Sequence, residues 1–532
     1  MRVSSLFVLS AVLVAAGCAP TAPIRAQRVE PALAAPLGDP LVDPPVLRSV
    51  NGVLETALVA TPATVTVAGQ TFTSNVYNGL YIPPVLIVAR GDTVRLRLVN
   101  RTGPAELRLD SLNVSAVTNL HYHGMVIPPT PPADYIYLTV PPAGATMAGH
   151  AGHAAPADAT ADDAAAGQPG QIGENVYEYL WTVPQDHAQG LHWYHPHPHG
   201  LSEGQVLSGM SGLLIVDGMI ETNYPDLASL RRRIMLLKDI RLPGAPDAAP
   251  LTKTINGQAN PTIGMQPGEY QVWEIGHVGA DAFFNLQIEG PSGPVPFYVM
   301  SRDGNVLSSM VQQDSLFLAP GARVTVAAGG FGPGQYLLRS LAVNTGPQGD
   351  PNPEVVLATV VVQGTAMDAA AGAQVREQLG RGPAHPEAAP PTPAQLLAQP
   401  ITRRRTITFS ETANGDTFFM NGLTFEMGRI DAVARVGDVE EWTIRNVSGE
   451  LHVFHIHQLD FLVTQVQGEQ QEPLGLRDVV DVSFQQNGVP GEVTLIVPFT
   501  NPLIVGKFPF HCHILEHEDG GMMMNMVVLP RD

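Results

Sequence analysis

One sequence pattern occurs three times in this chain and limits the folds open to it. Residues 91–103 align without gaps on residues 437–449, and residues 268–279 form a weaker third copy. Each copy begins at a turn and continues with apolar residues at alternate positions, the period of a half-buried β-strand. Each is preceded by an Asn-Gly pair, a dipeptide that favours hairpin turns. These pairs are Asn78-Gly79, Asn256-Gly257 and Asn421-Gly422.

The repeats predict an all-β chain of three related domains. A chain of 532 residues is too long for one core, and 52 glycines and 48 prolines suit a turn-rich protein. We therefore expect three consecutive β-sandwiches or barrels. Their predicted ranges are 46–218, 219–365 and 401–532.

Two segments interrupt the strand pattern. Residues 141–172 are rich in Ala, Gly, Pro and Asp, and residues 366–400 are rich in Ala, Pro and Gln. Both have few apolar residues, so we expect both to be mobile. The first is predicted to be an insertion in domain one, where Met147, His150 and His153 are interpreted as incidental polar-loop residues, with loose copper binding as the alternative. The second is predicted to be a linker with a short helix near residues 373–379.

The N-terminus has the pattern of an export signal. A charged start and an apolar run from Leu6 to Ala16 precede Gly17-Cys18, and the run is too short to be a stable membrane span. We predict a signal over 1–18, a linker over 19–45, and a location in the periplasm or cell envelope. The Gly-Cys ending resembles bacterial lipoprotein signals, which predicts a lipid anchor at Cys18; plain export is the alternative. Ala19 favours an outer-membrane lipoprotein over one retained in the inner membrane.

Soft metal ligands are concentrated near the C-terminus. Cys512, His517 and Met522 offer a thiolate, an imidazole and a thioether, and with one more imidazole they make a blue-copper electron-transfer site. The chain has two cysteines, so Cys512 is the only thiol once the leader is removed. A lone thiol in an oxidising compartment is a liability unless a metal holds it. On a strand, His511 and His513 point to the face opposite Cys512, which predicts a second metal centre behind the first.

Ten of the 17 histidines fall into four clusters. An i, i+2 pair on a strand places both imidazoles on one face. One such pair is weak support for a metal site, but four together predict one. The clusters are His121-Tyr-His123, His195-Pro-His197, His452-Val-Phe-His455-Ile-His457 and His511-Cys512-His513 with His517. The middle repeat has only His277, which we interpret as structural.

Counting ligands predicts the number of metals. The blue site takes His452, Cys512, His517 and Met522, and eight histidines are left. Eight imidazoles suit three coppers held by two, three and three ligands, with positions open for oxygen species; one-electron and O₂ chemistry is typical of copper. Zinc does not favour a Cys-His-Met set. The eight are His121, His123, His195, His197, His455, His457, His511 and His513.

With these motifs in this order, the chain resembles three-domain multicopper oxidases of the bacterial laccase-like kind over nearly its whole length after the leader. The resemblance implies three consecutive cupredoxin-like, Greek-key domains. It implies four copper ions: one type 1, one type 2 and two type 3. It further implies O₂ and a small reducing substrate as partners, and it favours a monomer. The implied ligands are His121 and His455 for the type 2 copper, His123, His195 and His513 for one type 3 copper, and His197, His457 and His511 for the other.

The resemblance also implies a mechanism. Electrons enter at the edge of His452 or His517 and pass through Cys512 to His511 and His513, and four of them reduce O₂ to two waters. A modest potential is expected from Met522 as axial ligand.

Two carboxylates match positions where relatives place proton carriers. Asp134 lies ten residues after Gly124, where relatives place an acid near the type 2 copper, and Glu518 directly follows His517. The alternative for each is a surface or structural carboxylate. Met523, Met524 and Met526 are interpreted as strand and core residues, with a cuprous-ion relay as the alternative.

Several functions stay open or are disfavoured. A net charge of −20 argues against binding to nucleic acid. The leading hypothesis is an exported copper oxidase of phenols and similar aromatic donors. The alternative is a metallo-oxidase for Cu(I), Fe(II) or Mn(II), which would need carboxylates or methionines beside the blue site. A non-catalytic relative is disfavoured because every ligand position is filled, and a two-domain nitrite reductase because there are three repeats.

Overall fold

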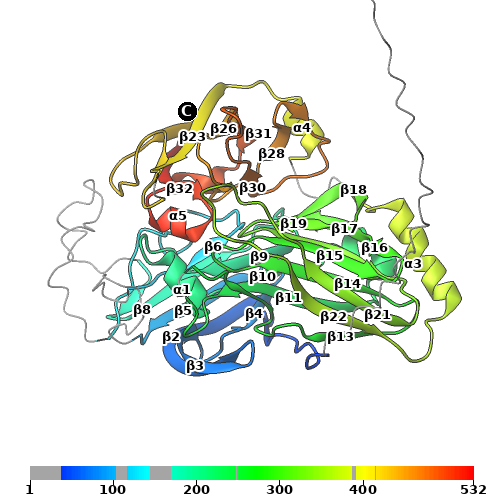
Figure 1. Cartoon of the computed structure of the whole chain (residues 1–532). Coiled ribbons are helices and arrows are strands. Elements are labelled where there is room, and N and C mark those ends of the chain that lie inside the picture. The colour runs from blue at the N-terminus through cyan, green and yellow to red at the C-terminus, as the bar shows by residue number, and fades with distance from the viewer. Residues whose placement is uncertain are drawn as a thin grey trace, which may run out of the picture. The chain divides into compact units, whose positions relative to one another are not determined.

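The computed structural model describes residues 37–102, 117–143, 169–246, 248–385, 391–413 and 415–531. Within these residues the strands form six sheets in three successive pairs along the chain (Figure 1), which confirms the all-β prediction. Cys18, Met147, His150 and His153 lie outside the described residues, as do the proposed signal and most of the 141–172 insertion. No helix in the described ranges combines the length and apolar composition that a membrane span requires.

The first pair of sheets encloses a core that includes Leu58, Leu96 and Tyr122. Helix α1 (Ser202–Ser208) precedes the last strand of this pair, and helix α2 (Met219–Asn223) follows that strand. One sheet has the order β1 (Val46–Arg48), β4 (Val85–Val88), β10 (Gly212–Val216), β9 (Gly190–His195), β6 (His121–His123). The other has the order β3 (Gln70–Tyr77), β2 (Val53–Val67), β5 (Thr93–Asn100), β8 (Val176–Thr182), β7 (Gln171–Gly173).

The second pair packs around Trp273, Phe284 and their neighbours. Its first sheet has the order β12 (Thr252–Ile255), β11 (Arg231–Ile240), β14 (Tyr270–His277), β20 (Arg323–Gly329), β17 (Phe297–Arg302), β18 (Asn305–Gln313). Its second sheet has the order β13 (Thr262–Met265), β22 (Val355–Val362), β21 (Gly334–Ser340), β15 (Phe284–Gly290), β16 (Gly293–Val295), and β19 (Leu316–Leu318) also pairs with β15.

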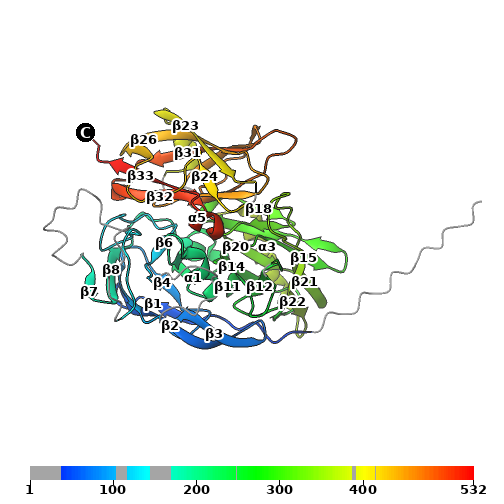
Figure 2. The ribbon, with the colours of Figure 1, turned by 60° about the vertical axis from the view of Figure 1, so that its left-hand side comes forward.

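The third pair packs around Trp442, Phe454 and Phe510. Figure 2 shows its two sheets one above the other, with β32 (Gly506–Cys512) and α5 (Leu515–Asp519) toward β6. The outer sheet has the order β24 (Phe418–Met420), β23 (Arg403–Glu411), β26 (Asp438–Asn446), β31 (Gly491–Phe499), β28 (Leu462–Val466), β29 (Glu469–Gln470). The inner sheet has the order β25 (Ala432–Arg435), β33 (Met523–Leu529), β32 (Gly506–Cys512), β27 (His452–Ile456), β30 (Val479–Val482).

The repeated sequence occupies the same place in each pair. Strands β5, β14 and β26 each pair in parallel with an earlier strand and antiparallel with a later one. Both residues of these three Asn-Gly turns have positive φ. In each turn the asparagine side chain accepts a 2.8 Å hydrogen bond from a strand N–H, that of Val59, Leu236 or Thr408. The repeat is therefore structural as well as sequential.

The expectation that residues 366–400 are mobile is wrong for the described part of that segment. Helix α3 spans Ala369–Arg381, beyond the predicted 373–379, and Asp368 caps its first turn. Its Val375 and Leu379 are buried against an apolar cluster that includes Tyr224, and Leu396 of α4 (Pro393–Leu397) is buried too. A few well-spaced apolar residues thus suffice to dock a segment of polar composition.

Candidate metal centres

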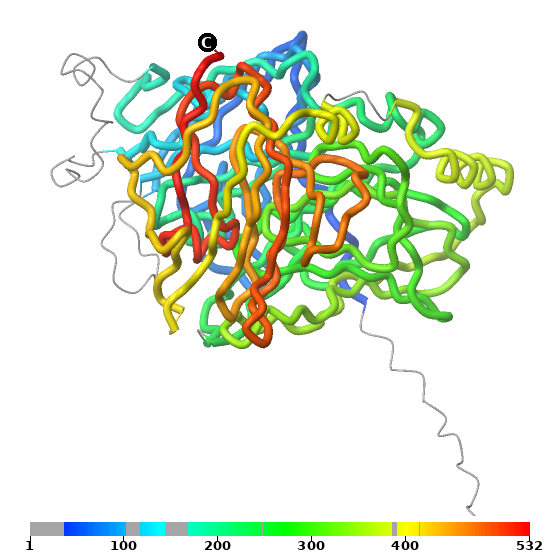
Figure 3. The backbone as a smooth tube through the Cα atoms, turned by 90° about the horizontal axis from the view of Figure 1, so that it is seen from above, coloured from blue at the N-terminus to red at the C-terminus, as the bar shows by residue number. Residues whose placement is uncertain are grey.

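The eight predicted histidines lie together between the first and third pairs of sheets. Edge strand β6 pairs with β9 so that His121 lies opposite His195, and β27 pairs with β32 so that His455 lies opposite His511. Figure 3 shows the red C-terminal strands overlapping the blue and cyan part of the first domain when seen from above. The two domains are in contact, because the Tyr137 hydroxyl donates to Asn525 Oδ1 at 2.6 Å. We call these eight residues the histidine cluster.

The imidazole nitrogens of the histidine cluster converge. His511 Nε2 lies 3.2 Å from His197 Nε2 and 3.1 Å from His457 Nε2. His513 Nε2 lies 3.1 Å from His123 Nδ1. All eight side chains are buried. Burial lowers the pKa of His457 and His513 well below the usual range, and the neighbouring imidazoles lower it further. Both rings therefore stay neutral.

Hydrogen bonds at the outer nitrogens orient these rings. Four of the rings can donate from Nδ1 to fixed oxygens: His121 to Asp134 Oδ2, His195 to Pro196 O, His455 to Asp478 O and His511 to Cys512 O. A ring protonated at Nδ1 has its lone pair at Nε2. The Nε2 atoms of His121, His195 and His455 are buried and have no hydrogen-bond partner among the described residues. Lone pairs without donors, held in position from behind, suit metal ions.

A second group of ligands lies within the third domain. His452 Nδ1 and His517 Nδ1 are 2.9 Å apart, and Cys512 Sγ lies 3.8 Å from the first and 3.6 Å from the second. Met522 is buried, and its carbonyl accepts from Cys512 N while its N–H donates to His517 O. We call His452, Cys512, His517 and Met522 the Cys512 site.

In this buried site Cys512 can be a thiolate only when a cation is bound beside it. Burial raises the pKa of the Cys512 thiol to about 12, with only two backbone contacts, to Val453 and Ile514, opposing the shift. A buried thiol ionises near neutral pH when a metal replaces its proton. A thiolate, two imidazoles and a thioether are soft or intermediate donors, so the donor set fits copper.

Met523, Met524 and Met526 lie in β33 and are buried in the third core. This agrees with their interpretation as core residues. It leaves the cuprous-relay alternative without exposed sulfur at these positions.

Asp134 and Glu518 both lie against the histidine cluster. Asp134 is buried and accepts from His121 Nδ1, Tyr122 N and Gln458 Nε2. Glu518 is buried, with Oε1 3.8 Å from His197 Nδ1 and from His199 Nδ1. Burial raises the pKa of the Glu518 carboxyl, but the neighbouring His197 and His199 outweigh burial and lower it to about 2.

Sequence reasoning missed several residues around the ligands. Asp478 accepts from His123 Nε2 at 3.2 Å and holds His455 through its carbonyl. Ser448 Oγ lies 2.8 Å from His452 Nε2, and Glu450 Oε2 lies 3.4 Å from His517 Nε2. None of these belongs to a histidine or cysteine motif, although Ser448 and Glu450 lie within four residues of His452. The middle repeat's His277 bonds backbone through both ring nitrogens, to Ala282 O and Gly279 N.

Known proteins share this sequence pattern and fold. A family model described as multicopper oxidase matches residues 390–532. The multicopper oxidase mco of Staphylococcus aureus is 24% identical over 464 residues, 84% of this chain and 82% of that protein. A laccase of Haloferax volcanii is 27% identical over 389 residues, 68% of this chain and 63% of that protein. The structure of a multicopper oxidase from Campylobacter jejuni, described as a metallo-oxidase, superposes with a TM-score of 0.68 at 22% identity, covering 93% of this chain and 96% of the other.

Residues 390–532 match the multicopper oxidase family model, and the chain as a whole is similar to multicopper oxidases in sequence and fold. It is a copper-dependent oxidoreductase that uses O₂ and a reducing substrate.

A cavity of about 410 Å³ opens beside the Cys512 site of this oxidase. His517, Glu450 and Ile514 of the third domain line one side, and segments 248–253, 281–283 and 345–356 of the second domain contribute most of the other. Apolar walls include Pro250, Phe283, Pro351 and Pro353. Of the two imidazoles of the Cys512 site, only that of His517 lines the cavity.

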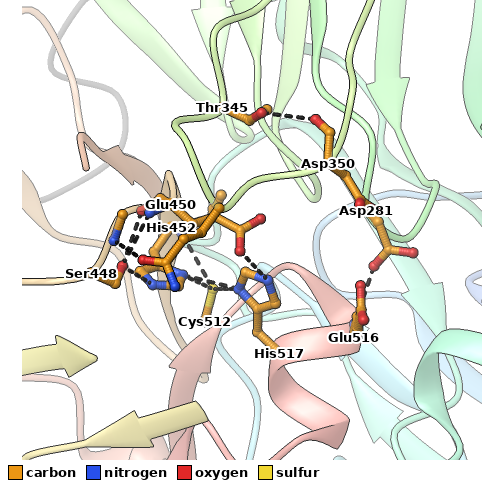
Figure 4. A network of polar contacts seen from close by, with 12 residues as sticks. Asp281, Thr345, Asp350, Ser448, Glu450, His452, Cys512, Glu516 and His517 are labelled. Carbon is orange, nitrogen blue, oxygen red and sulfur yellow. Dashed lines mark hydrogen bonds and ion pairs between the residues drawn. The ribbon is translucent and has the colours of Figure 1, made fainter. Parts of the chain in front are cut away.

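Carboxylates gather at the same cavity. Asp281, Asp350, Glu450 and Glu516 all line it, and Figure 4 shows them around the His517 edge of the Cys512 site. Asp281 Oδ1 accepts from Glu516 N at 3.1 Å, and Asp350 O accepts from Thr345 Oγ1 at 2.8 Å. Burial and the neighbouring carboxylates raise the pKa of the Glu516 side chain, in spite of His517. The cavity therefore combines apolar walls with a group of carboxyl side chains.

Proposed function

We propose that the oxidase takes electrons from small aromatic donors, such as phenols, in the cavity beside His517. The observation that carries this proposal is the shared wall of the cavity: the His517 ring, apolar Phe283 and Ile514, and the Glu450 carboxylate line one space. The apolar side chains can bury an aromatic ring, and Glu450 can accept a hydrogen bond from its hydroxyl. Loss of that proton makes one-electron oxidation easier.

We further propose the copper assignment. His452, Cys512, His517 and Met522 hold the type 1 copper. His121 and His455 hold the type 2 copper, with one type 3 copper on His123, His195 and His513 and the other on His197, His457 and His511. Support comes from the convergence of these nitrogens, since His197, His457 and His511 can meet at one ion, as can His452, Cys512 and His517. Bound copper supplies one-electron transfer and the reduction of O₂ to water.

The chain connects the two centres through its backbone. His511 and His513 flank Cys512, and His511 Nδ1 donates to Cys512 O at 2.8 Å. We propose that the Glu518 carboxylate relays protons on the His197 side of the cluster. On the other side, we propose that Asp134 orients His121 and serves as a proton carrier.

A second candidate donor is a hard divalent cation, Fe(II) or Mn(II). The four carboxylates of the cavity favour it, because oxygen ligands suit such ions. Soft Cu(I) prefers sulfur, and none of the described residues lining the cavity is Met or Cys.

Two variants separate the donors when O₂ consumption is measured. Ala249→Trp narrows the cavity, so KM for a phenol should rise several-fold while KM for Fe(II) changes little. Asp350→Asn should raise KM for Fe(II) and leave KM for a neutral phenol unchanged. Glu55→Gln, an exposed carboxylate on β2, is the matched control. If both cavity variants keep wild-type KM for every donor, the cavity is not the donor site.

The N-terminal predictions stand as proposals. We propose that residues 1–18 direct export to the periplasm or cell envelope, that Cys18 carries a lipid anchor, and that the mature protein is a monomer. Intact-mass analysis of the mature chain tests the anchor: a diacylglyceryl mass at Cys18 supports it, and an unmodified N-terminus contradicts it. Light scattering of the mature protein tests the monomer.

A further inference from the structure

Arg323 is a buried arginine at the start of β20, in the domain that contributes no histidine to the cluster. Its guanidinium forms a two-pronged ion pair with Asp478 of the third domain: Nη1 donates to Oδ1 at 2.6 Å and Nη2 to Oδ2 at 2.7 Å. Side chains of this kind are rarely buried unless they are paired. This pairing joins the second domain to the third.

Asp478 in turn holds two histidines of the cluster. Its Oδ1 lies 3.2 Å from His123 Nε2, so His123 presents Nδ1 to the cluster, and its carbonyl accepts from His455 Nδ1 at 2.7 Å. The His123 and His455 rings stack with centroids 3.9 Å apart. A shift of Asp478 would therefore turn both rings.

Arg323 is also fixed from the first domain. Its Nε donates to Leu191 O at 3.1 Å, on the strand that ends at His195. Gly124 directly follows His123 and has φ +81°; a Cβ there would lie 2.5 Å from Arg323 Nη2 and 2.7 Å from Asp478 Oδ2. The glycine after His123 is thus required by the approach of this ion pair as well as by its turn.

We propose that Arg323 is a positioning residue for the histidine cluster, through which the second domain sets the orientation of His123 and His455. The geometry needs arginine, because lysine offers a point charge and cannot form the two-pronged pair. Outer partners of metal ligands commonly change metal affinity 10–100-fold when mutated. This role rests on the proposed assignment of His123 and His455 to copper.

The test measures copper binding in the full-length protein. Arg323→Lys should keep the blue absorption of the Cys512 site, change the type 2 electron paramagnetic resonance (EPR) hyperfine splitting, and weaken retention of the cluster's copper against a chelator by about 10–100-fold. Asp478→Asn keeps the backbone carbonyl and should give the same changes. The double variant should add little, since both remove one interaction.

The matched control is Arg233→Lys. Arg233 is also buried in the second domain, where it donates to Gln271 Oε1 and Gly264 O, and it has no contact with the cluster. Wild-type EPR and copper retention in both Arg323→Lys and Asp478→Asn would overturn the proposal. Equal loss in Arg323→Lys and Arg233→Lys would also overturn it, because it would show general destabilisation.

A further variant separates this role from the copper assignment. His455→Ala should lose cluster copper if the assignment is correct. Full retention in His455→Ala would refute the assignment, whereas loss there with full retention in Arg323→Lys would refute only the role of Arg323.

Discussion

The Cys512 site and the histidine cluster are built in different ways. All four residues of the Cys512 site belong to one domain, and three of them lie within eleven consecutive residues. The histidine cluster is divided between the first and third domains, and Arg323 adds a contact from the second. A site inside one core depends on that core alone, whereas a site between domains also depends on their docking. The two centres should therefore respond differently to the same perturbation.

The largest expected effect follows from removing the thiolate. Cys512→Ser should abolish the blue absorption and reduce turnover to background, because electrons lose their entry point. The histidine cluster should keep its copper, since its ligands do not include Cys512. Type 2 EPR and copper analysis check this. Loss of copper from both centres would show that the cluster depends on the Cys512 site.

Glu518→Gln should affect the histidine cluster and leave the Cys512 site unchanged. It keeps the volume of the buried side chain but removes the carboxylate that can take up and release a proton, so kcat should fall about a hundredfold with copper content and blue colour unchanged. Rapid mixing of the reduced enzyme with O₂ measures the slowed step. Normal turnover would exclude a proton-carrying role for Glu518.

Weakening the contact between the first and third domains should separate the centres further. Tyr137→Phe removes the hydrogen bond to Asn525, which contributes about 1 kcal/mol. In a urea titration, the type 2 signal of this variant should disappear at lower urea than in wild type, and the blue absorption should change less. Coincident loss of both signals in wild type and variant would mean that the domains unfold as one unit.

The smallest effect is expected from Ser448→Ala. It removes the contact between Ser448 Oγ and His452 Nε2 at the Cys512 site. A change of about 1 kcal/mol between the oxidation states corresponds to roughly 40 mV for one electron. Redox titration of the blue absorption measures the shift, and the type 2 EPR spectrum should not change. A change in that spectrum would show that the two centres are coupled more tightly than their separate positions in the fold indicate.

The repeat and the ligand motifs could be read from the sequence because their signals are local. Alternation over eight residues predicts a strand, and the spacing of His121 and His123 or of His455 and His457 places ligands on one face. The length and docking of helix α3 were underestimated from the sequence, because Val375 and Leu379 pack against residues of the second domain rather than against their own segment.

What the sequence by itself determined was the three-domain all-β architecture and the residue types of both candidate metal centres, because strand period and ligand chemistry depend on near neighbours. What only the tertiary structure decided was the environment of those centres. The acidic cavity combines the second and third domains, and Arg323 meets Asp478 across 155 residues of chain. No spacing of residues in the sequence predicts such contacts, because the contacting residues are brought together only when whole domains pack.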